Sequence, residues 1–368
     1  MNLQSTPPRP RPLLAGEAVP WFRAKAIGGS DNYVFDTAAG RHILLLFFGR
    51  ATDPGAADAL ACVARHRGLF DDVRACFFGV TSDGGDEAAG RVAQQIPGVR
   101  YFLDPEGGLA GLYGAGGAER RHWLLIDPML RAVGAYPLEA GEAAIAALGK
   151  AIGDPALPDW APDWAPVLMA PRVLEPALCE RLIEHHRETG GEPSGFMREV
   201  GGKTVLLTDP AHKMRRDREI ADGSLCAILR ARILAALVPM VKRVFQFEVT
   251  RMERYIVGAY PAGEGHFRPH RDNTTRGTAH RRFAVTINLN SGEYDGGDLR
   301  FPEYGARTYR APTGGAVVFS CSMLHEATPV TRGTRYAFLP FLYDDAAARQ
   351  REENNPHLGE GIGAYRAG

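Results

Sequence analysis

A proline-rich segment divides the chain near its middle. Residues 153–171 read GDPALPDWAPDWAPVLMAP, in which proline recurs and the unit Asp-Trp-Ala-Pro is repeated. Each proline removes a backbone donor and fixes φ, so neither a helix nor a central strand can run through the segment. The chain of 368 residues also exceeds one ordinary domain of roughly 100–200 residues. The sequence therefore predicts two domains, residues 1–153 and 172–368, joined by a linker at residues 154–171.

The composition is that of a globular protein without a bulk charge. Lys plus Arg and Asp plus Glu both number 43, and apolar residues make up 45% of the chain. This balance gives no general attraction to nucleic acid or to an anionic membrane. The longest apolar run, ILLLFF at residues 43–48, is far below the roughly 18 residues of a membrane span, and residues 1–14 lack the apolar core of a signal peptide. We therefore expect a cytoplasmic protein without nucleic-acid or membrane partners.

The two halves differ in their hydrophobic patterns. Before the proline-rich segment, apolar runs such as HILLLFFG and CFFGVTSD alternate with helical patterns such as GAADALACVARHRGLF. This alternation predicts an α/β sandwich around a mixed sheet. After the segment, two helical stretches precede many short strands separated by Gly, Asn and Pro, which is typical of a barrel or two-sheet roll with helices outside. The predicted fold class is therefore α+β with two domains.

The stretch GHFRPHRDNTT, at residues 265–275, carries the strongest chemical signal. Residues i and i+2 of a strand point to the same face, so His270 and Asp272 can present an imidazole and a carboxylate to one point. A third ligand should come from another strand, and the candidates are His280, His325 and His357. His325 is preferred because it follows the buried-strand pattern GAVVFSCSML, where an inward polar group needs a purpose. His280 lies in a basic loop and His357 lies in a polar tail.

These side chains predict a metal site with room for a co-substrate. Two histidines and one carboxylate on one face of an octahedral ion leave open positions, which suits non-haem Fe(II) oxygen chemistry. A dicarboxylate such as 2-oxoglutarate would fill two of these positions, and its far carboxylate would then need a fixed cation. Arg335 follows His325 across the turn TRGT, so the next strand can aim its guanidinium into the cavity. A guanidinium can hold a carboxylate through two charge-assisted hydrogen bonds.

The order of these residues resembles the His-X-Asp…His…Arg/Lys signature of Fe(II)/2-oxoglutarate dioxygenases. The surrounding pieces AYPAGEGHFRPHRD, RFAVTINLN and YDGGDLRFPEYG are similar to the prolyl 4-hydroxylase branch, and the resemblance covers residues 167–344. It implies a double-stranded β-helix, or jelly roll, with Fe(II) held by His270, Asp272 and His325. It also implies that Arg335 binds the side-chain carboxylate of 2-oxoglutarate. Tyr260 matches the family tyrosine that hydrogen-bonds the same co-substrate, with one extra residue before the metal histidine.

The same resemblance implies the reaction. We expect a dioxygenase that uses O2 and 2-oxoglutarate to hydroxylate an unactivated C–H bond, releasing succinate and CO2, with ascorbate as a further reductant. The expected substrate is a prolyl residue of a protein or peptide, or an amino-acid-like small molecule. Asp272 argues against a halogenase, because that subclass loses the carboxylate to make room for halide.

The N-terminal half resembles a peroxiredoxin of the thioredoxin fold over residues 15–153, through AGEAVPWF, HILLLFFG, FFGVTSD, YFLDPEGGLAGLYG and RHWLLIDP. Arg121 stands where that family has its active-site arginine. The segment RATDPGAADAL keeps Pro54 but has Ala56 and Ala57 where the thiolate cysteine should be. Cys62 lies deeper in the following helix, as a small buried hydrophobe would. The resemblance therefore implies a scaffold without its nucleophile, kept for substrate docking, homodimer formation or partner recruitment.

Two other functions stay open at this point. The first is a thiol peroxidase that acts through the N-terminal domain, with the C-terminal domain as an accessory. The second is a non-catalytic sensor of iron or 2-oxoglutarate, because binding and turnover use the same residues.

Other polar residues near the motif are not expected to bind the metal. His266 and His280 are expected to form hydrogen bonds or to lie at the rim of the site. A run of arginines is expected to form a solvated positive face, with attraction of an acidic substrate or peptide as the alternative. This run consists of Arg268, Arg271, Arg276, Arg281 and Arg282.

Overall fold

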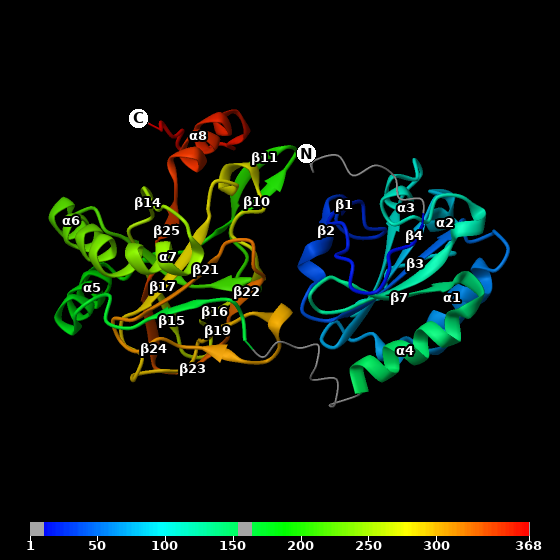
Figure 1. Cartoon of the computed structure of the whole chain (residues 1–368), viewed down its shortest axis with the longest axis horizontal. Coiled ribbons are helices and arrows are strands. Elements are labelled where there is room, and N and C mark those ends of the chain that lie inside the picture. Colours follow the sequence, from blue (N-terminus) through cyan, green and yellow to red (C-terminus); the bar gives the residue numbers. More distant parts are fainter. Residues whose placement is uncertain (1–10, 154–163, 368) are drawn as a thin grey trace. The chain divides into compact units, whose positions relative to one another are not determined.

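The computed structural model describes residues 11–153 and 164–367 (Figure 1). The chain divides into two compact units, one of residues 1–163 with 302–305 and one of residues 164–301 with 306–368. Each unit has a hydrophobic core of its own. The predicted α+β class with two domains is therefore confirmed. The boundaries at residues 1–153, 154–171 and 172–368 stay a prediction, with one correction given below.

A five-stranded mixed sheet forms the centre of the N-terminal unit, in the order β5-β4-β3-β6-β7. β3, β4 and β5 run parallel, whereas β6 and β7 are added antiparallel. Every residue of β4 and β6 is buried, as their continuous apolar runs predict. The strands of this unit are β1 (Arg23–Ala24), β2 (Tyr33–Val34), β3 (His42–Gly49), β4 (Ala75–Thr81), β5 (Val99–Leu103), β6 (His122–Ile126) and β7 (Ala132–Pro137).

Helices of the N-terminal unit bury their apolar faces against this sheet. Val63 of α1 and Leu148 of α4 share a core cluster with Leu44 and Leu46 of β3. A parallel β3-α1-β4 unit followed by the antiparallel pair β6-β7 and a closing α4 is a thioredoxin-like arrangement, so the predicted α/β sandwich is confirmed. The helices are α1 (Ala56–Arg65), α2 (Gly85–Ala88), α3 (Gly108–Leu112) and α4 (Gly141–Gly153).

Two main sheets build the C-terminal unit. The larger has nine strands, with β14-β25-β17-β24-β15-β13-β9 as its main path, β21 attached to β17, and β8 attached to β21; the smaller has the order β12-β16-β22-β19-β20. One pocket takes its lining from both sheets, as in the predicted jelly roll, which is confirmed. The strands are β8 (Leu168–Ala170), β9 (Glu192–Pro193), β10 (Phe196–Val200), β11 (Lys203–Leu207), β12 (Lys213–Met214), β13 (Arg216–Glu219), β14 (Arg251–Glu253), β15 (Ile256–Pro261), β16 (His266–His270), β17 (Phe283–Asn288), β18 (Asp295–Gly296), β19 (Leu299–Arg300), β20 (Thr308–Tyr309), β21 (Ala316–Ser320), β22 (His325–Ala327), β23 (Val330–Arg332), β24 (Thr334–Phe338) and β25 (Phe341–Tyr343).

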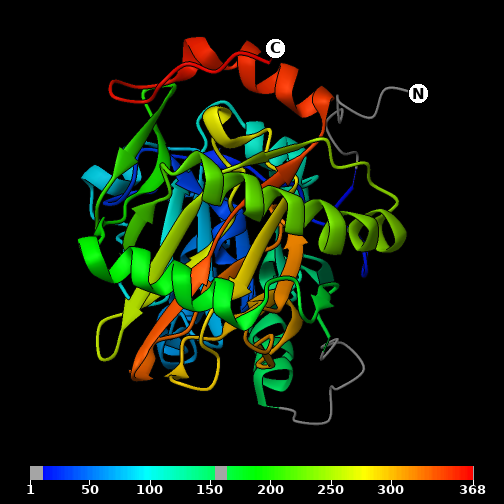
Figure 2. The ribbon, with the colours of Figure 1, turned by 90° about the vertical axis from the view of Figure 1, so that its left-hand side faces the viewer.

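Flanking helices cover the large sheet of this unit (Figure 2). Leu182 of α5 and Leu229 of α6 lie in one core cluster with Val285 of β17 and Phe338 of β24. This packing supports the sheet from outside and leaves its other face for the pocket. The helices are α5 (Pro176–Thr189), α6 (Gly223–Arg232), α7 (Val238–Phe245) and α8 (Asp345–Glu353).

The predicted second helix of this unit is continuous but changes its winding. α6 passes through a π-helical turn at Ile233–Leu237 into α7, where Pro239 falls in the first turn. A π-turn in front of a proline accommodates the missing N–H within one long helix. By length and composition alone, Gly223–Phe245 could cross a membrane, with a hydropathy of 1.8. One side of it, including Ile233 and Val241, is nevertheless packed in the hydrophobic core.

The predicted linker is too long at its C-terminal end. Leu168–Ala170 forms β8, which pairs antiparallel with β21, and the Ala165 N–H donates to the Tyr309 hydroxyl at 2.6 Å. The proline argument correctly excluded a central strand, since β8 pairs with a single neighbour and lies at an edge. Residues 164–171 therefore belong to the C-terminal unit, whereas residues 154–163 lie outside the described part of the chain.

Replacing Leu229 with alanine should destabilise the C-terminal unit by about 2–5 kcal/mol, because it leaves a cavity in the core. Leu234→Ala in the same helical segment is the matched control. The Leu234 side chain is 50% exposed, so its loss should change the free energy of unfolding by less than about 0.5 kcal/mol. Urea unfolding followed by circular dichroism measures both variants, and equal losses would contradict this packing.

Candidate metal centre and pocket

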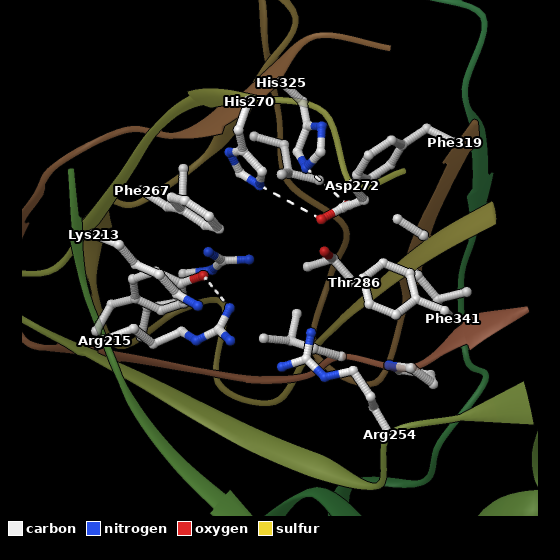
Figure 3. Close-up of a pocket in the computed structure, with 18 residues that line it drawn as sticks. Lys213, Arg215, Arg254, Phe267, His270, Asp272, Thr286, Phe319, His325 and Phe341 are labelled. Atoms are coloured by element: carbon white, nitrogen blue, oxygen red, sulfur yellow. Dashed lines mark hydrogen bonds and ion pairs between the residues drawn. The ribbon is translucent and has the colours of Figure 1, made fainter. Parts of the chain in front are cut away.

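Three metal-ligating side chains converge where two strands of the smaller sheet pair. His270 ends β16 and His325 begins β22, and the two residues are partners in antiparallel register. Asp272 lies just beyond the strand end, where its N–H donates to the Cys321 carbonyl at 3.0 Å. Asp272 Oδ1 lies 3.7 Å from His270 Nε2, and Asp272 Oδ2 lies 3.3 Å from His325 Nε2 (Figure 3). The three residues predicted from the sequence are thus brought together.

Backbone carbonyls hold both imidazole rings in a ligating orientation. His270 Nδ1 lies 2.8 Å from the Arg268 carbonyl oxygen, and His325 Nδ1 lies 3.0 Å from that of Met323. A carbonyl can only accept, so each Nδ1 carries the proton and each Nε2 keeps a lone pair for a metal. The His270 ring also stacks on Phe267, with ring centres 3.4 Å apart. These contacts fix the tautomer and the direction of each nitrogen.

Burial and mutual charge set the protonation states of the ligands. Burial, together with the neighbouring His325, holds the pKa of His270 well below its usual 6.5. For Asp272, burial alone would raise the pKa, but His325 and His270 outweigh it and lower the pKa overall. At neutral pH the His270 imidazole is therefore neutral and the carboxylate ionised. These are the forms in which both groups bind a metal.

The donor set fits a divalent transition metal. Two imidazole nitrogens and one carboxylate oxygen, one from each residue, lie within 4.8 Å of one another. Imidazole suits Fe, Cu, Ni and Zn, and two histidines with one carboxylate and open positions suit Fe(II) in particular. The chemistry of these side chains therefore agrees with the predicted Fe(II) centre.

A pocket of about 500 Å³, counting its open mouth, lies between the sheets beside these ligands. Its lining includes Val285, Leu299 and Phe319, so one part of the wall is apolar. Cationic side chains form another part, and Lys213, Arg215 and Arg254 lie apart from the metal ligands in Figure 3. The pocket thus combines a ligand set for a metal with a region suited to anions.

Arg335 is the cation that the sequence predicted, and its side chain is buried in this pocket at 2% exposure. Its Nε and Nη1 have no hydrogen-bond partner among the described residues. The guanidinium carbon lies 4.8 Å from the centre of the Tyr260 ring, across the paired strands β15 and β24. A buried guanidinium without an anion is costly, so this end of the pocket favours a carboxylate.

Tyr260 lies at the same end of the pocket. Its hydroxyl oxygen accepts a hydrogen bond from Arg215 Nη1 at 3.2 Å. Arg215 is held in turn by Asp217, whose Oδ2 accepts from Arg215 Nη2 at 2.6 Å. Because the Tyr260 oxygen is already an acceptor, its proton is available for a second group. The structure therefore places Tyr260 beside Arg335, despite the extra residue before the metal histidine.

Three further cations of the pocket were missed by the sequence reasoning. Lys213 and Arg215 stand two positions apart, and a strand presents such residues on one face, so this signal was available. Arg254 gave no such signal, because its side chain is directed by a left-handed backbone with φ of 67°. These three residues line the pocket together with Arg335.

The predicted positive face is only partly exposed, since Arg268 and Arg276 are exposed whereas Arg271 is buried. Its guanidiniums contact groups of the protein: the Ala211 carbonyl for Arg268, the Ser322 carbonyl for Arg271, His357 for Arg276, Glu253 for Arg281 and Gln350 for Arg282. His266 forms hydrogen bonds as expected. His280 is not a rim residue, since it is 1% exposed and its Nε2 lies 3.2 Å from Glu253 Oε2.

The N-terminal unit shows why a thiol reaction is not supported there. Ala56 opens α1 and is buried, and Arg121 Nη2 donates to Asp53 Oδ2 at 2.6 Å. The family arginine is therefore neutralised by a carboxylate. Cys62 is buried within α1, and burial with the nearby Glu142 raises the pKa of its thiol. Its environment opposes the thiolate that peroxidase chemistry needs.

Comparisons with known proteins agree with the C-terminal site. The sequence pattern of the 2OG-Fe(II) oxygenase superfamily matches residues 252–343. A PKHD-type hydroxylase of Verminephrobacter eiseniae is 32% identical over 199 residues, which cover 50% of this chain and 79% of that protein. A PKHD-type hydroxylase of Cupriavidus metallidurans is 40% identical over 80 residues, covering 19% of this chain and 35% of the relative.

Solved structures are similar to parts of the chain. A prolyl-4-hydroxylase of Pseudomonas putida has a TM-score of 0.34 at 19% identity and covers 48% of this chain and 92% of that one. The peroxidoxin BcpB of Mycobacterium tuberculosis has a TM-score of 0.31 at 19% identity and covers 37% of this chain and 96% of that one.

Removing one ligand should weaken metal binding strongly. Loss of an outer partner of a metal site costs roughly 10–100-fold in affinity, so Asp272→Ala, which removes a direct donor, should cost at least about 100-fold. Calorimetric titration with Mn(II) at pH 7 measures the change. His266→Gln, at the start of the strand that precedes Asp272, is the control and should bind Mn(II) like the wild type. Equal affinity in Asp272→Ala and wild type would contradict this metal centre.

Proposed function

Because this chain belongs to the 2OG-Fe(II) oxygenase superfamily and is a hydroxylase, we propose that His270, Asp272 and His325 hold its Fe(II). We further propose that Arg335 and Tyr260 hold the distal carboxylate of 2-oxoglutarate. The observation that carries the proposal is the pairing of the two features in one pocket. The ligand set of two histidines and one aspartate lines the same cavity as Arg335, whose buried Nε and Nη1 have no hydrogen-bond partner among the described residues.

The two ends of the pocket match the two ends of 2-oxoglutarate. Arg335 offers Nε and Nη1, two donors without partners among the described residues, and such a fork matches a carboxylate. Tyr260 adds a hydroxyl proton, since its oxygen already accepts from Arg215. With the distal carboxylate held there, the keto-acid end is left for the open positions of the metal. The side chains therefore fix the co-substrate in one orientation.

The protein's own contribution to the reaction is positioning and protection. When bound, Fe(II) would couple two oxidations by O2: the oxidative decarboxylation of 2-oxoglutarate to succinate and CO2, and the hydroxylation of a substrate C–H bond. The imidazoles of His270 and His325 present Nε2 to the metal, because their Nδ1 atoms are held by backbone carbonyls. Phe319 and Val285 form an apolar part of the wall beside the metal ligands.

The substrate of this hydroxylase is proposed to be a prolyl residue of a protein or peptide, or an amino-acid-like small molecule. The resemblance of residues 167–344 to the prolyl 4-hydroxylase branch supports this choice. Ascorbate is proposed as a further reductant that keeps the metal in its Fe(II) form. Both assignments are open to direct assay with the purified protein.

The N-terminal unit is proposed to bind rather than to react. Its Asp53–Arg121 ion pair and its buried cysteines support a scaffold without a nucleophile. Homodimer formation through this unit and a cytoplasmic location stay predictions. The thiol peroxidase alternative gains no support from these side chains.

Purified protein with Fe(II), 2-oxoglutarate and O2 should form succinate, and Asp272→Ala should reduce the rate by at least about 100-fold, because the variant loses a metal donor. Liquid chromatography with mass detection measures succinate. The His266→Gln variant should keep the wild-type rate. Undiminished turnover in Asp272→Ala would contradict the assignment, and 2-oxoglutarate binding without any succinate would favour the sensor instead.

Arg335→Gln should raise the KM for 2-oxoglutarate by about 100-fold, because two charge-assisted hydrogen bonds to a buried group are lost. Arg335→Lys keeps the charge but not the planar fork, so it should raise the KM by about 10-fold. Succinate formation at varied 2-oxoglutarate gives both values. An unchanged KM in Arg335→Gln would place the distal carboxylate elsewhere.

A further inference from the structure

The pocket contains more positive charge than the proposed co-substrate requires. Four cations line it, Lys213, Arg215, Arg254 and Arg335, whereas Asp272 is its lining carboxylate. Arg215 is matched by Asp217, which accepts from its Nε and its Nη2. Arg335 is assigned to 2-oxoglutarate. Lys213 and Arg254 are therefore left without a use in the proposed function.

Lys213 is a buried lysine in the wall of the pocket. It lies on β12 with 5% exposure, and its Nζ donates to the Gly195 carbonyl at 2.6 Å. Among the described residues it forms no ion pair within 4.0 Å. Burial, and then the charge of Arg215, hold its pKa well below the usual 10.5. A buried ammonium is retained at a cost unless an anion joins it.

Arg254 is held toward the same pocket by an unusual backbone. Its φ of 67° lies in the left-handed region, which a side chain with a Cβ rarely adopts. Its Nη2 lies 3.5 Å from Asp217 Oδ2, an oxygen already bound to Arg215 Nη2 at 2.6 Å. One carboxylate thus serves two guanidiniums. A strained residue that brings an incompletely neutralised charge into a pocket is a sign of ligand binding.

The charged groups around the pocket indicate which kind of ligand would complete it. Fe(II) and the dianion 2-oxoglutarate cancel each other, so they leave the charge of the pocket unchanged. Asp272 and Asp217 are the carboxylates set against the four basic side chains of the pocket. Two of these basic side chains, Lys213 and Arg254, therefore have no carboxylate of their own among the described residues.

We propose that the molecule hydroxylated in this pocket is a carboxylic acid, and that its carboxylate binds Lys213 and Arg254. The inference rests on the proposed function and names the substrate class of the same site. Lys213 Nζ lies 4.7 Å from the centre of the Phe267 ring, which stacks on His270 at 3.4 Å. An acid bound to Lys213 is therefore one aromatic ring away from a metal ligand. That proximity brings a nearby C–H of the acid to the reacting centre.

The test measures binding rather than turnover. Protein loaded with Mn(II) and 2-oxoglutarate is titrated by calorimetry with a set of N-acetyl-L-amino acids, N-acetyl-L-proline included, and with the matching neutral amides. Acids that bind should bind at least about 10-fold more tightly than their amides, since a charge-assisted hydrogen bond to a buried cation is lost in the amide. Equal affinity of acids and amides overturns the proposal. The absence of binding by any acid at about 10 mM also overturns it.

Two variants assign the effect to the residues. Lys213→Gln removes the charge but keeps a donor for the Gly195 carbonyl, and Arg254→Asn removes the charge with a residue that tolerates positive φ. Each should weaken the acids by at least about 10-fold and leave the amides and 2-oxoglutarate within about two-fold. Arg276→Gln, which removes a charge bound to His357 outside the pocket, is the matched control and should change nothing.

Failure of this inference is distinguishable from failure of the proposed function. If wild-type protein binds Mn(II) and 2-oxoglutarate but does not prefer acids to amides, the substrate class is wrong and the proposed function stands. If it binds neither Mn(II) nor 2-oxoglutarate, the proposed function itself fails. If Lys213→Gln weakens 2-oxoglutarate instead of the acids, Lys213 serves the co-substrate and the inference is overturned.

Discussion

Two cross-strand pairs, one in each sheet of the C-terminal unit, determine where the chemistry takes place. His270 faces His325 across β16 and β22, and Tyr260 faces Arg335 across β15 and β24. A slip of one residue in either register would turn the side chains of that strand to the opposite face. The metal ligands and the anion-binding end therefore keep their places only while both registers hold. Helices packed on the large sheet, with an apolar core beneath them, stabilise that arrangement.

The pocket between these pairs departs from the usual rule that buried charges are matched. Arg335 and Lys213 are buried and have no carboxylate partner in the part of the chain that the structure describes, so ligands must offset the cost of burying them. In the N-terminal unit, by contrast, the charge of Arg121 is neutralised by Asp53. One unit thus keeps buried basic side chains for binding, whereas the other pairs its Arg121 with a carboxylate of its own.

Much of this arrangement could be predicted from local patterns, and the rest depends on tertiary pairing. Alternation of strands and helices indicated the fold of the N-terminal half, and many short strands separated by turn residues indicated that of the C-terminal half. The end of the linker could not be predicted, because β8 exists through its pairing with β21. His325 was chosen over His280 by its place after a buried strand; burial itself could not decide, since both are buried. Lys213 could have been predicted, because it stands two positions from Arg215 and a strand presents such residues on one face. Arg254 could not, because a left-handed residue between two strands follows from the closed fold.

The most direct measurement of the central claim is a crystal structure of the protein with Mn(II) and 2-oxoglutarate, in which Mn(II) replaces Fe(II) and prevents turnover. We expect the metal to be bound by His270, Asp272 and His325 and the distal carboxylate to accept two hydrogen bonds from Arg335. A metal held by other side chains, or a distal carboxylate bound away from Arg335, would contradict the account.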